Sequence, residues 1–180
     1  MALFREQSDV SVRPATSQDP AHVVVVQLAA WRATHLDVLG EGVLDRLDPA
    51  AMRDQWERAI TAPPSAQHRV LVACEGARVV GLATTAPAPD GGVEILALEV
   101  HPEHRRAGHG SRLLTACVDL AREHGPTHLL TWVLDGDDAR GSFLSSSGMA
   151  ADGAVRTLAT GPDGEDDPRT VREHRWVAEL

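Results

Sequence analysis

Residues 93–114 join an apolar run, a turn rich in arginine and glycine, and the start of an amphipathic pattern. The turn reads Arg105-x-x-Gly108-x-Gly110. A helix that starts at such a turn has free N–H groups at its first residues, and the helix dipole makes that end positive. Glycines let a ligand approach the main chain closely. The segment therefore predicts a phosphate or pyrophosphate site and, with it, a phosphorylated cofactor.

The residues of this turn exclude two common phosphate-binding loops. The chain contains no Gly-Lys-Ser or Gly-Lys-Thr, so a nucleoside-triphosphate loop is excluded. A dinucleotide-binding turn needs a third glycine for close helix packing, and Leu113 stands at that position. An ordinary strand-to-helix turn with solvated arginines is the alternative, but it leaves two close glycines and a double arginine unexplained.

The run of a strand ending in Val100-His101-Pro102, the glycine turn and an amphipathic helix resembles the acetyl-CoA loop of the GNAT superfamily of N-acetyltransferases. The resemblance covers residues 10–178 and is most detailed over 93–149. It implies an α+β fold with a mixed, mostly antiparallel central sheet that is flanked by helices and whose strands 4 and 5 splay apart. Acetyl-CoA would lie in that gap.

The resemblance assigns the cofactor to the glycine loop, to the fourth strand and to the segment after the fifth strand. Backbone N–H groups of the loop would hold the pyrophosphate, with charge-assisted help from arginines that include Arg112, and the fourth strand would pair with the pantetheine arm. Asp137 stands where the family usually has asparagine. The predicted cofactor-binding residues are Leu98, Val100, Arg105, Arg106, Ala107, Gly108, His109, Gly110, Ser111 and Asp137.

Acetyl transfer to an amine also needs a base, because an amine with a pKa of about 10 is protonated at neutral pH. The resemblance implies a catalytic glutamate at Glu94 on the fourth strand, and Glu99 is the second candidate. Strict alternation would put these carboxylates on opposite sides, but this strand commonly carries a bulge in the family, which changes the parity. If neither is the base, both are solvent-facing strand carboxylates. A backbone N–H near Val100 would stabilise the oxyanion.

The segment after the fifth strand departs from the family's pattern. Leu144 stands at the position of the tyrosine that usually protonates the leaving sulfur, and Gly148-Met149 replaces Gly-Phe. Either catalysis has been lost, or a genome that avoids A/T-rich codons has replaced the tyrosine. The complete absence of Lys, Asn and Tyr favours the second explanation and a bacterial source. A thiol with a pKa of about 8.5 leaves passably without full protonation, so water or Ser145 would suffice.

The resemblance also gives an acceptor pocket at Trp31, His35 and Trp132, although single aromatic residues often belong to the core. The net charge of −9 argues against a nucleic-acid partner and is compatible with a cationic acceptor. Glu99, His101, Glu103 and His104 resemble a set of metal ligands. They straddle a turn that is already assigned to phosphate binding, so no metal is predicted.

The 180 residues are enough for one domain. Cys74 and Cys117 lie in apolar stretches, which is typical of buried thiols in a reducing compartment. The first residues lack the apolar core of a signal peptide, and the valine run at 23–26 is too short to span a bilayer. We therefore expect a cytoplasmic protein, monomeric or homodimeric, without a membrane partner.

The remaining patterns show no repeat and no linker, which favours a single α+β domain over residues 1–180. Asp19 followed by Pro20 favours a capped helix over the valine run. Strands are predicted over residues 10–13, 70–74, 79–85, 93–100, 128–134, 149–159 and 170–178. Helices are predicted over residues 21–31, 39–47, 49–60, 110–124 and 138–146.

The sequence thus predicts an acyltransferase that moves an acetyl group from acetyl-CoA to a primary amine of a small molecule or peptide, by direct attack in a ternary complex. Two alternatives remain. One is an acyl-CoA-binding module without turnover, which the missing tyrosine suggests. The other is a transferase that uses a larger acyl-CoA.

Overall fold

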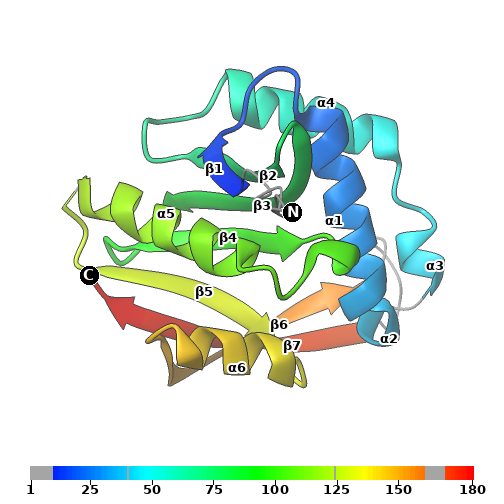
Figure 1. The fold of residues 1–180 in the computed structure, drawn as a ribbon. Coiled ribbons are helices and arrows are strands. Elements are labelled where there is room, and N and C mark those ends of the chain that lie inside the picture. Colours follow the sequence, from blue (N-terminus) through cyan, green and yellow to red (C-terminus); the bar gives the residue numbers. More distant parts are fainter. Residues whose placement is uncertain (1–9, 40, 124, 161–168) are drawn as a thin grey trace, which may run out of the picture.

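The computed structural model describes residues 10–39, 41–123, 125–160 and 169–180 (Figure 1). The N-terminal residues on which the expectation of no signal peptide rests lie outside these ranges. Within them, strands form one mixed sheet in the order β1-β2-β3-β4-β5-β7-β6. The strands are β1 Val10–Pro14, β2 Arg69–Glu75, β3 Arg78–Pro87, β4 Val93–Val100, β5 His128–Leu134, β6 Ala150–Thr160 and β7 Arg169–Glu179.

Neighbouring strands are antiparallel except for β4 and β5, which are parallel. This arrangement confirms the predicted mixed, mostly antiparallel sheet. The helices are α1 Pro20–Thr34, α2 Leu36–Leu39, α3 Glu41–Leu44, α4 Pro49–Thr61, the 3-10 turn η1 Pro102–His104, α5 His109–Glu123 and α6 Asp138–Ser146. No helix among the described residues combines the length and the hydropathy that a membrane span requires.

The prediction of one helix over residues 39–47 is wrong, because α2 ends at Leu39 and α3 covers only Glu41–Leu44. Gly42 falls in this stretch, and glycine is a poor helix former. The helix predicted over the valine run is confirmed as α1. Val23 and Val26 of α1 pack against Val72 of β2, so burial of one face outweighs the preference of valine for strands.

Helices cover both faces of the sheet. The α5 helix packs on one face through Leu113 and Cys117, which join Ile95 and Leu129 of the sheet in the larger core cluster. The α1 helix packs on the opposite face. Cys74 and Cys117 are free and buried, as the sequence predicts, and burial raises the pKa of Cys117 to about 12.

Asp19 ties the start of α1 to β1 rather than capping the helix, since its side chain makes no cap hydrogen bond. Its carboxylate accepts hydrogen bonds from Arg13 Nη1 at 2.7 Å and Nη2 at 2.9 Å, and from the N–H of Thr16 at 2.6 Å. The residue is 3% exposed. The Arg13 guanidinium is the main reason why the pKa of Asp19 falls from 3.8 to about 2.

Asp19→Asn should lower the free energy of unfolding by about 2 kcal/mol at neutral pH. Because the pKa of Asp19 is lower in the folded state, this contribution is complete above its unfolded pKa and is lost as the pH falls toward 2. Urea denaturation of both proteins at several pH values measures it. Asp54→Asn is the control, since the Asp54–Arg53 ion pair is exposed. Equal stability of Asp19→Asn and wild type at neutral pH would contradict the prediction.

Candidate active site

The parallel strands β4 and β5 stay together for only three residue pairs. These pairs are Val93 with Leu129, Glu94 with Leu130, and Ile95 with Thr131. At the last pair the buried Thr131 hydroxyl donates a hydrogen bond to the Ile95 carbonyl at 2.9 Å. Over the rest of β4 the described residues show no pairing with β5. The predicted splay is therefore confirmed, and it begins after Ile95.

A bulge in β4 lies where the two strands separate. Opposite β3, Thr85 pairs with Ile95 and Thr84 pairs with Ala97, so Leu96 has no partner across the pair. Leu96 is 59% exposed. The bulge on the fourth strand is as expected from the sequence.

The bulge puts the two candidate glutamates on one face of the sheet. Ile95 before the bulge and Leu98 after it both contact the core cluster under α5, whereas Ala97 packs on the α1 side. Alternation from Ile95 and from Leu98 then places Glu94 and Glu99 both on the α1 side.

The main chain of β4 after the bulge faces the gap. The N–H of His101 donates to the Val80 carbonyl at 2.8 Å, which makes these two residues a hydrogen-bonded pair of the β3–β4 ladder. In an antiparallel ladder the hydrogen-bonded pairs alternate with pairs whose backbone groups point outward. The N–H and C=O groups of Val100 and Leu98 therefore point away from β3, toward the space that β5 has left.

The loop between η1 and α5 has the conformation of an anion-binding turn. Arg106 and Gly108 have φ of +62° and +82°, in the left-handed region. Within the described part of the chain, the N–H groups of residues 106–111 have no hydrogen-bond acceptor. Successive free N–H groups in such a turn form a concavity for an anion, and the N-terminus of α5 adds its dipole. The strain at the non-glycine Arg106 is typical of a ligand-binding site.

A cavity of about 350 Å³ lies between β4, the start of α5 and α6. All the predicted cofactor residues except Ala107 line it. Thr34, Arg140 and Phe143 also line it, and the sequence analysis missed them. The cavity is therefore continuous from the free N–H groups of the loop to the gap between the diverging strands.

The loop side chains differ in orientation. Arg106 is exposed, and Arg105 Nε donates weakly to the Val100 carbonyl at 3.4 Å. Arg112 Nη1 donates to the Ala107 carbonyl at 3.0 Å and so braces the turn from within. A Cβ at Gly108 would lie 2.6 Å from Arg112 Nη1, the end of a flexible side chain that can move, so the need for glycine there comes from its positive φ.

Glu75 at the end of β2 holds both ends of the loop. The fully buried His109 side chain donates from Nε2 to Glu75 Oε1 at 2.7 Å, so His109 can reach a cofactor only with its main chain. His104 donates from Nδ1 to Glu75 Oε2 at 3.0 Å. Hydrogen bonds from His109 and then His104 lower the pKa of Glu75. No local sequence signal links a hairpin carboxylate to histidines so far along the chain.

The start of α6 completes the cavity wall. The Asp137 carboxylate caps α6 by accepting from the Arg140 N–H at 3.0 Å, and Arg140 Nη1 lies 3.3 Å from Glu99 Oε1. Leu144, at the family's tyrosine position, is buried and lines the cavity. Ser145 lines a second groove between α6 and β7 and not this cavity, which argues against its suggested role as proton donor.

Glu94 lies in a charged cluster on the face of the sheet that α1 covers. Arg156 Nη1 is 3.8 Å from Glu94 Oε1, and Arg156 Nε donates to Glu173 Oε2 at 2.6 Å. The Arg156 guanidinium stacks 4.3 Å above the Trp132 ring. Burial raises the pKa of Glu94, and the nearby Arg156 only partly opposes it. A carboxylate with a raised pKa suits general-base chemistry.

The other predicted acceptor residues lie at the end of α1. Trp31 and His35 meet edge to face with their centroids 6.2 Å apart, and His35 Nδ1 lies 3.0 Å from Thr34 Oγ1. Burial lowers the pKa of His35, and the Glu99 carboxylate opposes this effect. Trp31, His35 and Trp132 do not line the cavity itself, whereas Thr34 does.

The sequence model of the Acetyltransferase (GNAT) family matches residues 30–148, which is more than half of the chain. This protein belongs to the GNAT family, and it is an acyltransferase. The uncharacterized N-acetyltransferase YuaI of Bacillus subtilis (strain 168) is 26% identical over 133 residues, 70% of this chain and 72% of that protein. The mycothiol acetyltransferase of Thermomonospora curvata is 38% identical over 95 residues, 52% of this chain but only 30% of that enzyme.

Solved structures share the whole fold at low sequence identity. PaiA N-acetyltransferase from Thermoplasma acidophilum, in complex with coenzyme A, superimposes with a TM-score of 0.78 at 15% identity and covers 96% of this chain and 99% of that one. YncA from Salmonella typhimurium, with its cofactor acetyl-CoA, gives a TM-score of 0.64 at 22% identity, with 95% and 94% covered.

Proposed function

We propose that this protein transfers an acetyl group from acetyl-CoA to a primary amine, by direct attack within a ternary complex. The observation that carries the proposal is the row of free N–H groups at residues 106–111, which opens into a cavity that reaches the gap between β4 and β5. A diphosphate fits the loop end, and an extended thioester arm fits the strand end. The coenzyme A complexes of PaiA and YncA support this choice of cofactor.

Different residues of the chain bind different parts of the cofactor. The loop N–H groups, with Arg105 and Arg106, bind the phosphates by charge-assisted hydrogen bonds. The outward N–H and C=O groups of Leu98 and Val100 pair with the amides of the pantetheine arm. The N–H of Val100 also stabilises the oxyanion that forms on the thioester carbonyl.

Glu94 acts as the base that takes the proton from the attacking amine. It lies one residue before the end of β4–β5 pairing, and burial raises its pKa, which brings its basicity closer to the working pH. Glu99 lines the cavity, but its 3.3 Å contact with Arg140 is closer than the 3.8 Å contact of Glu94 with Arg156, so we assign Glu99 the role of fixing α6 against β4. The acceptor amine approaches from the α1 side, past Trp31 and His35.

The leaving thiolate takes its proton from water. Leu144 provides no proton, and Ser145 lines the other groove. The same observation favours a second candidate, an acyl-CoA-binding module without turnover.

Incubation with acetyl-CoA and a panel of primary amines separates the two candidates. Free thiol should appear only when both substrates are present, and mass spectrometry should find the acetylated amine. Tight binding of acetyl-CoA without thiol release for any amine would support the binding module. Release of free thiol from longer acyl-CoA thioesters but not from acetyl-CoA would mean that the acyl donor is a larger acyl-CoA. Failure to bind coenzyme A at all would refute the site.

A further inference from the structure

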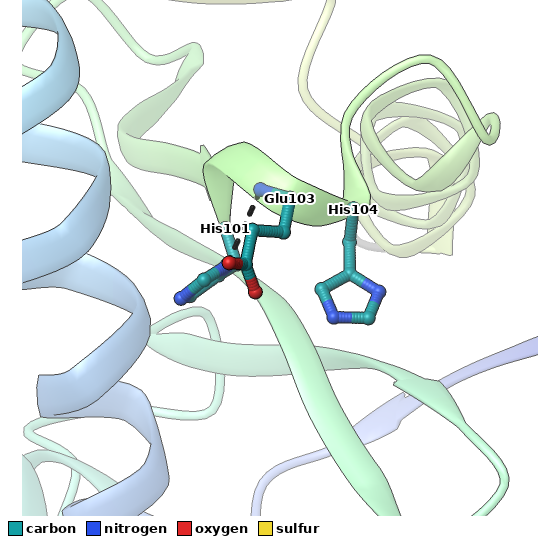
Figure 2. A group of neighbouring side chains, drawn as sticks. All are labelled: His101, Glu103 and His104. Carbon is teal, nitrogen blue, oxygen red and sulfur yellow. Dashed lines mark hydrogen bonds between the residues drawn. The ribbon is translucent and has the colours of Figure 1, made fainter.

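Three metal-ligating side chains meet on the turn between β4 and the cofactor loop. His101 precedes η1, and Glu103 and His104 belong to it. One candidate ligand atom from each residue lies within 4.8 Å of the other two. The two imidazole rings face edge to face with centroids 5.7 Å apart, and Figure 2 shows the Glu103 carboxylate between them. Glu99 is not part of this group, because it pairs with Arg140.

His104 has a free lone pair, and the lone pair of His101 accepts only one weak hydrogen bond. His104 donates its Nδ1 proton to the Glu75 carboxylate, so the neutral ring keeps its lone pair on Nε2. His101 accepts a weak hydrogen bond at Nδ1 from the N–H of Glu103 at 3.4 Å, so a metal at Nδ1 would replace that bond. A neutral imidazole with a free lone pair is the form that binds a metal.

Glu75 gives His104 the support that metal-bound histidines have. Ligating histidines almost always donate their other ring N–H to a carboxylate or carbonyl, which fixes the tautomer and the ring orientation. Here Glu75 is in turn fixed by the buried His109. The support therefore exists in the protein independently of any metal.

Against the expectation from the sequence, we propose that His101, Glu103 and His104 bind a divalent transition metal of the zinc type, with water at the open position. Two imidazoles and one carboxylate favour zinc, cobalt or nickel over magnesium and calcium, which prefer oxygen ligands only. Bonds of about 2 Å in a tetrahedral site need ligand atoms about 3.3 Å apart, so the separations must shrink when metal binds. Glu103 is exposed and free to rotate inward.

The site borders the cofactor cavity through His104, which belongs to both. A metal there would tie the end of β4 to the turn that leads into Arg105 and Arg106. Metal binding would stabilise the folded state by mass action, whether or not a cofactor is present.

Isothermal titration of the purified, chelator-treated protein with zinc chloride, without coenzyme A, tests the site. We expect one ion per chain and a higher melting temperature. His101→Ala and His104→Ala should each lower zinc affinity at least about tenfold, and Glu75→Gln should lower it by a similar factor without removing a ligand. His22→Ala, at an exposed histidine of α1, is the matched control and should change nothing. Cobalt should give d–d absorption bands without a thiolate charge-transfer band.

Absence of one-to-one binding at zinc concentrations of about 100 µM would overturn the site. Equal affinity in wild type, His101→Ala and His104→Ala would show an adventitious ion only. Unchanged affinity in Glu75→Gln would remove Glu75 from the site. If a histidine variant fails to fold, Glu103→Gln at the exposed carboxylate gives the same test. No arm depends on acetyl transfer, so the outcome is independent of the proposed function.

Discussion

Gly110→Val should abolish coenzyme A binding while the protein stays folded. Gly110 is the second residue of α5, and its N–H is one of the free groups of the loop. A Cβ built there points across the cavity, 3.5 Å from Phe143 Cζ and 3.9 Å from Leu98 Cδ2. These are ordinary contacts, so the fold tolerates the first carbon. The two methyl groups of valine would fill the path of the diphosphate, and affinity should fall at least about 100-fold.

Gly42→Val is the matched control, since a Cβ at Gly42 meets no atom within 4 Å. It should leave coenzyme A affinity unchanged, and Gly110→Ala should give an intermediate loss. Isothermal titration measures the affinities, and thermal melting checks the fold. Wild-type affinity in a folded Gly110→Val protein would mean that the diphosphate binds elsewhere.

Glu94→Gln should lower kcat by about 100-fold or more at neutral pH and leave acetyl-CoA affinity almost unchanged. Burial raises the pKa of Glu94, and a base works only when deprotonated. The wild-type rate should therefore rise with pH through this raised pKa, and the variant should lack that inflection. The variant should recover as the pH approaches the pKa of the acceptor amine, because free amine then exists without a base. Initial rates of thiol release across the pH range measure the loss of kcat, the inflection and the recovery.

Glu99→Gln separates the two glutamates. It breaks the ion pair with Arg140 at the cavity wall, so it should weaken cofactor binding without recovery at high pH. If Glu99→Gln instead loses kcat and recovers with pH while Glu94→Gln behaves as wild type, the base is Glu99.

Local signals were sufficient for most of the fold. The strand at 128–134 and the helix at 138–146 have the predicted bounds, because the apolar run of the first and the cap at Asp137 next to the second are local signals. The glycine turn was also readable, since its conformation depends on residues next to one another. The prediction of one helix over residues 39–47 was wrong, since it did not take into account that Gly42 disfavours a long helix.

Contacts between segments that are distant in the chain could not be predicted from the sequence. Glu75 bonds to histidines in the cofactor loop, and Arg140 reaches Glu99 across the gap. Each of these pairs depends on how the strands are ordered in the sheet, which no spacing in one sequence reveals. The positions of Trp31, His35 and Trp132 outside the cavity lining likewise depend on the packing of α1 and on the divergence of β5 from β4.

The burial of both cysteines has a practical consequence for enzymology. Cys74 and Cys117 are shielded from solvent, and burial raises the pKa of Cys117 to about 12, so little reactive thiolate is available on the native protein. A disulfide reagent added during turnover will therefore report the coenzyme alone. A slow second phase of reaction with the reagent, in turn, will show that the protein is unfolding and exposing its cysteines.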